Sequence, residues 1–163
     1  MPPPPRPAPR SHGRPSGRRG NDPASPAAHW STRASVPIEI PLDICERVSR
    51  LCLALPEVTV RVDESLVAER STAYSFDIRR RSFCLLMARE DPAGKPVPLL
   101  VIRASSAERD ALLPLGHPFF APRAGRDRIG VMLTPHTDWE EIRELVTDSY
   151  RILAPKKLTA LLD

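Results

Sequence analysis

Residues 74–102 read YSFDIRRRSFCLLMAREDPAGKPVPLLVI and contain three consecutive strand patterns. Tyr74, Phe76 and Ile78 alternate with polar residues, a period of two that predicts a half-buried strand. The runs at 82–88 (SFCLLMA) and 98–102 (PLLVI) are apolar on both faces and predict two more strands. The links at 79–81 (RRR) and 91–95 (DPAGK) are too short for a parallel crossover, so the sheet should be antiparallel.

Weaker strand signals lie on either side of this stretch. Residues 59–62 and 66–68 are short and precede it, and residues 129–133 read as the last strand. Between them, Ser105 or Ser106 can cap a short helix that runs to about Leu113 with Glu108 near its start. Residues 114–126 are rich in Pro and Gly and predict a loop.

The first helix is predicted between Pro41 and Pro56. Proline suits a first helical position and cannot continue a helix interior, so these two residues bracket the segment. Apolar residues recur at three- to four-residue spacing and form one stripe, made of Ile44, Cys45, Val48, Leu51, Cys52 and Leu55. A reactive thiol needs an exposed, electropositive setting, so the two cysteines of the stripe read as small core residues.

The last helix has the clearest boundaries. Asp138 can accept hydrogen bonds at its start, Glu141 three residues later completes a capping box, and Pro155 ends it. Its predicted core face consists of Trp139, Ile142, Leu145, Val146, Ser149, Ile152 and Leu153. The element order predicts an α+β domain with a twisted antiparallel sheet of about five strands and helices packed on one face.

The basic charge of the chain is concentrated before this domain. Residues 1–37 hold six arginines, one acidic residue and 10 of the 20 prolines, which predicts a disordered Pro/Arg-rich tail. Residues 38–163 hold 18 basic and 19 acidic residues and form the predicted folded domain. The net charge of +4 therefore gives no reason to treat the folded domain as a nucleic-acid binder.

Several classes of protein are excluded by missing motifs. No run approaches the roughly 18 apolar residues of a membrane span, so we expect no membrane association. The three cysteines (Cys45, Cys52 and Cys84) are few and odd in number, which favours a reduced, cytoplasmic chain. Zinc-ligand spacing and glycine-rich phosphate loops do not occur, so we expect no metal or other cofactor.

Five segments in order resemble the MmcQ/YjbR family, and together they span residues 41–162. They are residues 51–57 (LCLALPE), 74–83 (YSFDIRRRSF), 100–104 (LVIRA), 116–122 (GHPFFAP) and 138–157 (DWEEIRELVTDSYRILAPKK). The resemblance implies a CyaY-like or secretion-chaperone-like α+β fold and a "double-wing" DNA-binding role. The sequence departs from the family at two places. The family's hairpin glycine is replaced by Arg80 or Arg81, and its Trp before the last strand by Arg128 or Ile129.

The first functional hypothesis is a non-catalytic protein that binds double-stranded DNA through basic loops. Guanidinium groups match phosphate oxygens, and no helix presents a set of base-reading side chains, so binding should be electrostatic and salt-dependent. Against it stands the ordinary reading that charged loops are merely solvated. The candidate contacts are Arg79, Arg80, Arg81, Arg123, Arg126, Arg128, Lys156 and Lys157.

The alternative is a protein-interaction adaptor with no nucleic-acid role. It would use the open face or edge of the sheet, with Phe119, Phe120 and Trp139 as contacts, although aromatic residues more often cover a core. In either case we expect a monomer.

An enzyme is the third reading. His117 and His136 are the only histidines of the predicted domain, and neither stands in a pattern of nucleophile, base and acid. We therefore expect exposed loop histidines, no catalytic residue and no metal site.

Overall fold

All helices and strands of the described residues lie in one of two units of the chain. The computed structural model describes residues 1–5, 7, 38–63, 72–123 and 125–163. The chain divides into units Met1–Arg33 and Ala34–Asp163. The predicted disordered tail at 1–37 lies almost wholly outside the described residues, and so does the predicted strand at 66–68.

The second unit is built on an antiparallel sheet, as its short links predict. Within the described residues the sheet has six strands in the order β1-β2-β3-β4-β6-β5. Strands β1 to β4 pair in chain order, β4 then pairs with β6, and β5 lies at the edge beside β6. The strands are β1 (Thr59–Val62), β2 (Tyr74–Ile78), β3 (Arg81–Glu90), β4 (Pro96–Arg103), β5 (Phe119–Phe120) and β6 (Arg128–Met132).

The prediction of a plain loop at residues 114–126 was wrong. This segment contains the end of the 3-10 helix η2 (Leu113–Leu115) and the two residues of β5, so the sheet gains a strand over the number expected. Phe119 pairs with Val131 and Phe120 with Gly130. Two residues are too few to show a periodic pattern, which is why the strand is invisible in the sequence.

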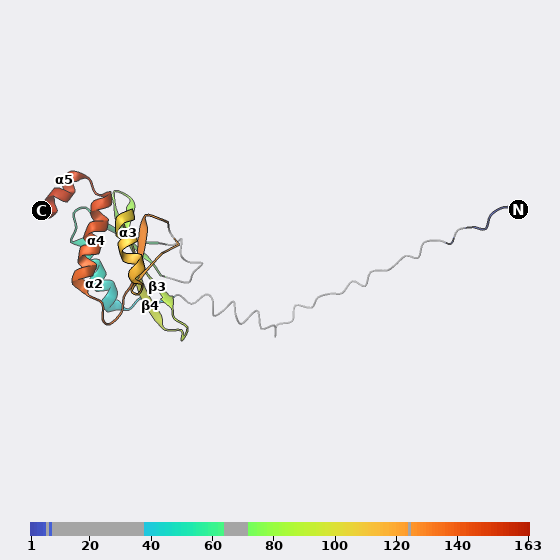
Figure 1. The fold of residues 1–163 in the computed structure, drawn as a ribbon, viewed down its shortest axis with the longest axis horizontal. Helices are drawn as coiled ribbons and strands as arrows, with labels where there is room; N and C mark the ends of the chain where they lie inside the picture. The colour runs from blue at the N-terminus through green and yellow to red at the C-terminus, as the bar shows by residue number, and fades with distance from the viewer. Residues whose placement is uncertain (6, 8–37, 64–71, 124) are drawn as a thin grey trace. The chain divides into compact units, whose positions relative to one another are not determined.

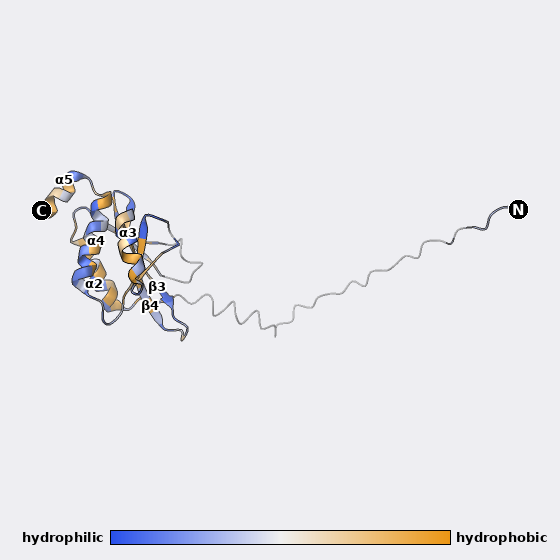
Figure 2. Cartoon of the chain, in the orientation of Figure 1, coloured by the Kyte–Doolittle hydropathy of each residue, from blue (hydrophilic) through white to orange (hydrophobic). Residues whose placement is uncertain are grey.

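Two long helices, α2 (Leu42–Leu53) and α4 (Trp139–Leu153), lie side by side over one face of the sheet (Figure 1). Both alternate between hydrophobic and hydrophilic residues along their length (Figure 2), and their apolar residues join one core with β2, β3, β4 and β6. The short elements are α3 (Ser106–Leu112), α5 (Lys156–Thr159) and η3 (Ala160–Leu162). The predicted cap of α3 is confirmed, because Ser105 and Glu108 form a reciprocal capping box.

The core face of α4 differs from the prediction at two residues. Ile152 was expected inside but is 49% exposed, whereas Tyr150 was not expected and is fully buried. At 100° per residue, Ile152 falls about 120° from Val146, while Tyr150 falls within about 40° of it. Ile152 was assigned to the core face because it is apolar, but it lies on the exposed side of the helix. The amphipathic Tyr150 lies in the core instead.

A bulge in β3 turns two consecutive side chains toward the helices. The β2–β3 register shifts between Phe76, which pairs with Cys84, and Asp77, which pairs with Ser82. Phe83 is the extra residue, so both Phe83 and Cys84 enter the core beneath α2 and α4. The opposite face of the sheet has a smaller apolar cluster of Ala73, Leu85, Met87, Leu99 and Val101, with Phe120 packed against it.

Candidate functional site

The antiparallel topology gathers most of the predicted basic residues at one end of the sheet. β2 ends at Ile78, β3 begins at Arg81, β4 ends at Arg103 and β6 begins at Arg128. Because neighbouring strands run in opposite directions, these four termini lie at the same end. The basic end, as we call it, comprises Arg79, Arg80, Arg81, Arg103, Arg109, Arg126 and Arg128.

The turn between β2 and β3 is a tight two-residue turn without glycine. Arg79 has φ 52° and Arg80 has φ 66°, the left-handed pair that a type I′ hairpin needs. The Arg79 guanidinium donates to Glu57 Oε2 at 3.2 Å. Arg80 and Arg81 are exposed, so their guanidinium groups are accessible at the tip of the hairpin.

Hydrogen bonds from α4 place its C-terminal half over the basic end. Ser149 accepts from the Arg103 backbone N–H at 2.8 Å and donates to the carbonyl of Phe83. Tyr150 donates its hydroxyl to the carbonyl of Pro56 at 2.7 Å. Figure 1 shows α5 continuing from this end of α4, and α5 begins with the exposed Lys156 and Lys157.

The entry to β6 is held by two arginines from outside the loop. Arg103 donates from Nη1 to Asp127 Oδ2 at 2.5 Å, and Arg109 donates from Nη1 to the carbonyl of Arg126 at 2.6 Å. The backbone N–H of Ala104 also donates to the Asp127 carbonyl at 3.0 Å. These bonds attach residues 126–127 to the end of β4 and to α3.

Charges in this cluster perturb one another. Burial lowers the pKa of Arg128, the positive charge of Arg103 lowers it further, and Asp127 opposes both. For Asp127, burial is the largest effect and raises the pKa. The charge and hydrogen bond of Arg103, a hydrogen bond from its own backbone and the charge of Arg128 together outweigh burial and leave that pKa below its ordinary value. Arg123 is exposed in the same loop.

Sequence reasoning missed Arg103 and Arg109. Arg103 follows directly after the apolar run 98–102, and its side chain is only 13% exposed. Its position directly after an apolar strand is the signal that could have identified Arg103. A charged residue at the end of a buried strand is rarely buried without a partner. Arg109 had no comparable signal, since it lies in a short helix among polar neighbours.

The three aromatic residues of the adaptor hypothesis do not share one surface. Phe119 is 8% exposed and belongs to the core under the helices. Phe120 packs on the other face of the sheet. Trp139 is half-buried at the start of α4, with the Arg47 guanidinium 5.0 Å from its ring centroid.

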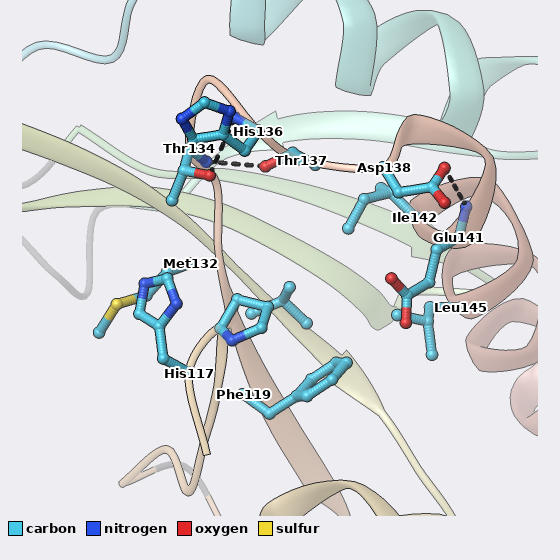
Figure 3. A pocket seen from close by; sticks show the side chains of 12 residues that line it. His117, Phe119, Met132, Thr134, His136, Thr137, Asp138, Glu141, Ile142 and Leu145 are labelled. Carbon is cyan, nitrogen blue, oxygen red and sulfur yellow. Dashed lines mark hydrogen bonds between the residues drawn. The ribbon is translucent and has the colours of Figure 1, made fainter. Parts of the chain in front are cut away.

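A pocket of about 460 Å³ lies at the opposite end of β6, beside the start of α4 (Figure 3). The fold brings His117 and His136 to this one pocket, a proximity the sequence did not show. Glu141 and Ile142 line it from the helix. Among the residues that the structure describes, no group of three His, Cys, Asp or Glu side chains could hold a metal ion.

Three polar side chains around this pocket, those of Thr134, Thr137 and Asp138, bond to the local backbone. Asp138 caps α4 by accepting from the N–H groups of residues 140 and 141, so its predicted role as the cap is confirmed, but Glu141 does not return the bond that would complete the predicted capping box. Thr134 Oγ1 accepts from the His136 N–H at 3.2 Å, and Thr137 Oγ1 accepts from the Thr134 N–H at 2.7 Å. Figure 3 shows these bonds at the rim, where they shape the loop rather than align a nucleophile with a base.

The cysteines have the structural role expected of them. Cys52 and Cys84 are fully buried and Cys45 is half-buried, all as free thiols. A hydrogen bond with Cys84, followed by burial, raises the pKa of Cys52, and burial also raises that of Cys45. Both effects disfavour the thiolate that a nucleophile requires.

Two comparisons bear on identity. The family model described as YjbR matches residues 53–152. This range contains β1 through β6 and nearly all of α4, so it includes the whole sheet of the described residues. A search of curated proteins finds no match. Within the described residues, no helix is both long enough and apolar enough to cross a membrane.

Proposed function

This chain belongs to the YjbR family, and we propose that it is a non-catalytic protein that binds double-stranded DNA through the basic end. The observation that supports this best is topological. Clusters far apart in the sequence, at the β2–β3 turn and at the entry to β6, lie at the same end of one sheet. Lys156 and Lys157 follow from the part of α4 that is bonded over that end.

The chemistry of these residues suits the phosphate backbone rather than the bases. Arg80 and Arg81 are exposed on a narrow hairpin, and a guanidinium can bind two phosphate oxygens at once. Apart from Arg109 on the seven-residue α3, the basic end lies on strand ends and turns and not on a long helix that could enter the major groove. Contacts of this kind position a protein on DNA without selecting a sequence.

Two carboxylates limit the positive potential of this region. Glu57 pairs with Arg79, and Asp127 pairs with Arg103. The exposed groups left for phosphate are Arg80, Arg81, Arg123, Arg126, Lys156 and Lys157. We therefore expect weak binding with a steep salt dependence rather than tight binding at physiological salt.

The test measures fluorescence anisotropy of a short DNA duplex at several salt concentrations, with the full chain and with residues 34–163. We expect the Arg80→Gln, Arg81→Gln double variant to reduce the slope of log affinity against log salt by about 2. Arg89→Gln is the matched control, because Arg89 is exposed near the other end of β3. If residues 34–163 do not bind the duplex at low salt, the proposal is wrong.

A protein partner at the edge of the sheet is the second candidate function. β1 is a terminal strand, and two of its valines are exposed, Val60 by 46% and Val62 by 57%. Exposed apolar residues on an edge strand favour strand addition by a peptide. A stoichiometric partner that co-purifies with the native chain and is lost on Val62→Lys would support this function. Full binding by the lysine variant would contradict it.

A further inference from the structure

Two arginines face each other directly across neighbouring strands of the sheet. Arg103 of β4 and Arg128 of β6 are register partners, so their side chains leave the same face at adjacent positions. Like charges directly opposite each other destabilise a sheet. The repulsion is poorly screened here, because the Arg103 side chain is only 13% exposed and Arg128 is also largely withdrawn from water.

Hydrogen-bond donors in this cluster lack acceptors. The Nε atoms of Arg109 and Arg128 are buried, and neither has a hydrogen-bond partner among the described residues. They are the only buried side-chain nitrogen or oxygen atoms in that condition within the described ranges, and both belong to the basic end. An unsatisfied buried donor destabilises the fold, and more strongly when it is charged. The cluster therefore combines positive charge with two donors that lack acceptors.

The carboxylate of Asp127 shows where a negatively charged oxygen can bind in this cluster. Its carboxylate accepts from Arg103 Nη1 and lies beside Arg128 in sequence, but its side chain is 61% exposed. Arg109 donates to the neighbouring carbonyl of Arg126. One exposed carboxylate thus bonds to Arg103 of β4 and feels the charge of Arg128 of β6, while Arg109 of α3 donates to the backbone carbonyl beside it. A phosphate group has more acceptor oxygens and would satisfy donors that this carboxylate leaves free.

We infer that Arg103, Arg109 and Arg128 form a binding site for one phosphate group, which displaces the Asp127 carboxylate when it binds. On the proposed function this group is a phosphate of the DNA backbone, and in that respect the inference rests on that function. The site differs from the hairpin contacts because its donors are partly buried and are held by the sheet and by α3. In this arrangement one phosphate of the duplex is bound at a defined position, and the exposed arginines and lysines bind neighbouring phosphates more weakly.

The first experiment detects the site directly in the full-length chain. Arginine Nε–H resonances are followed by NMR while inorganic phosphate is added, and then while a short DNA duplex is added. We expect the resonances of the three site arginines to shift together and to saturate, whereas Arg89 does not. Equal shifts at Arg89, or no shift at the three site arginines, would overturn the inference.

The second experiment uses a variant that should gain affinity, because a loss can always result from misfolding. Asp127→Asn frees Arg103 and should tighten inorganic phosphate about tenfold, the effect of one charge-assisted hydrogen bond. Arg128→Gln should weaken it by a similar factor. Glu140→Gln is the control, since it removes another exposed carboxylate paired with an arginine, on α4. If Asp127→Asn lowers stability without raising phosphate affinity, Asp127 is only a structural partner of Arg103 and the inference is wrong.

The two arms separate this inference from the proposed function. Duplex binding that is unaffected by Asp127→Asn and Arg128→Gln, together with no saturable phosphate binding at the three arginines, would overturn the phosphate site while the hairpin mode of DNA binding stands. Saturable phosphate binding at the three arginines without any duplex binding would support the site and overturn DNA as its source of phosphate.

Discussion

Tyr150 joins three parts of the molecule that are distant in the sequence. Its ring packs edge-on against Phe83, with centroids 5.5 Å apart and planes at 84°, and its hydroxyl donates to the carbonyl of Pro56. It therefore links α4 to the β3 bulge and to the segment after α2. Edge-on aromatic pairs are favourable beyond the area they bury.

Replacing Tyr150 with phenylalanine should lower the free energy of unfolding by about 1 kcal/mol. The substitution removes one hydrogen bond and leaves the ring contact with Phe83 in place. Urea denaturation should show a lower midpoint with an unchanged slope. A loss of several kcal/mol would mean that the ring itself had moved.

The same residue predicts an alkaline limit to stability. Burial raises the pKa of Tyr150 above its usual 10.0, Glu57 raises it further, and Arg79 opposes the rise. The native state therefore holds the proton more tightly than the unfolded chain does. This contribution is complete below about pH 10 and is lost as pH rises through the native pKa. Tyr150→Phe should remove the part of the loss in unfolding free energy above about pH 10 that comes from Tyr150. Identical dependences of the unfolding free energy on pH for the variant and the unmodified chain would contradict the prediction.

The β2–β3 turn stores strain at Arg80. A non-glycine residue in the left-handed region destabilises the native state by about 1–2 kcal/mol. Replacing it with glycine removes this strain, but the greater conformational freedom of glycine in the unfolded chain offsets part of the gain. With φ 66° at this position, Arg80→Gly should raise the free energy of unfolding by about 0.5–1 kcal/mol. Arg81→Gly is the matched control, because Arg81 lies in β3 and glycine should weaken a strand. Equal destabilisation by both would show that the turn is not strained.

At the scale of elements, β5 depends on a close approach between Phe120 and Gly130. A Cβ atom at position 130 would lie 2.3 Å from the Phe120 ring, so this ring packs directly on the glycine backbone of β6. The pair lies in register on the face opposite the helices. An aromatic ring over a strand glycine covers backbone that would otherwise be exposed.

Gly130→Ala should displace the Phe120 ring and destabilise the chain by about 1–2 kcal/mol. In a Phe120→Ala background the same change should be neutral or stabilising, since the clash is gone and alanine suits a strand better than glycine. A double-mutant cycle by urea denaturation measures this coupling. Additive effects would show that the ring already has room to move.

At the scale of the whole molecule, the two charged segments of the chain should contribute differently to the proposed DNA binding. Residues 1–37 carry six arginines and one acid, whereas residues 38–163 carry 18 basic and 19 acidic residues. Electrostatic attraction to DNA from the first segment needs no particular arrangement of its arginines. On the proposed function, attraction from the second would depend on the fold, which concentrates arginines at one end of a nearly neutral domain.

Deleting residues 1–33 should therefore weaken duplex binding and lower its salt slope, but keep the effect of the Arg80→Gln, Arg81→Gln variant. Distant and independent contributions add within about 0.5 kcal/mol, so the variant should lose the same factor in both backgrounds. Salt titrations of the four proteins measure this. A variant effect that vanishes without residues 1–33 would show that the basic end does not act on its own.

Local patterns in the sequence were enough to predict the hairpins, the antiparallel sheet, both long helices and the Asp138 cap of α4. At α2 the structure places Pro41 one position before the predicted first helical residue, as an N-cap without a side-chain hydrogen bond. Side-chain periodicity and capping depend only on neighbours along the chain, so they can be read without the fold. The hairpin cluster at Arg79, Arg80 and Arg81 was equally visible, because a turn between two strands must be exposed.

Only the tertiary structure decided which residues meet. The β3 bulge, the two-residue β5 and the burial of Tyr150 in place of Ile152 all depend on contacts between distant segments. So does the opposition of Arg103 and Arg128, which lie 25 positions apart and face each other through the β4–β6 register. The free energy of such pairings depends on the register of the whole sheet. It therefore cannot be predicted from the residues next to either arginine in the sequence.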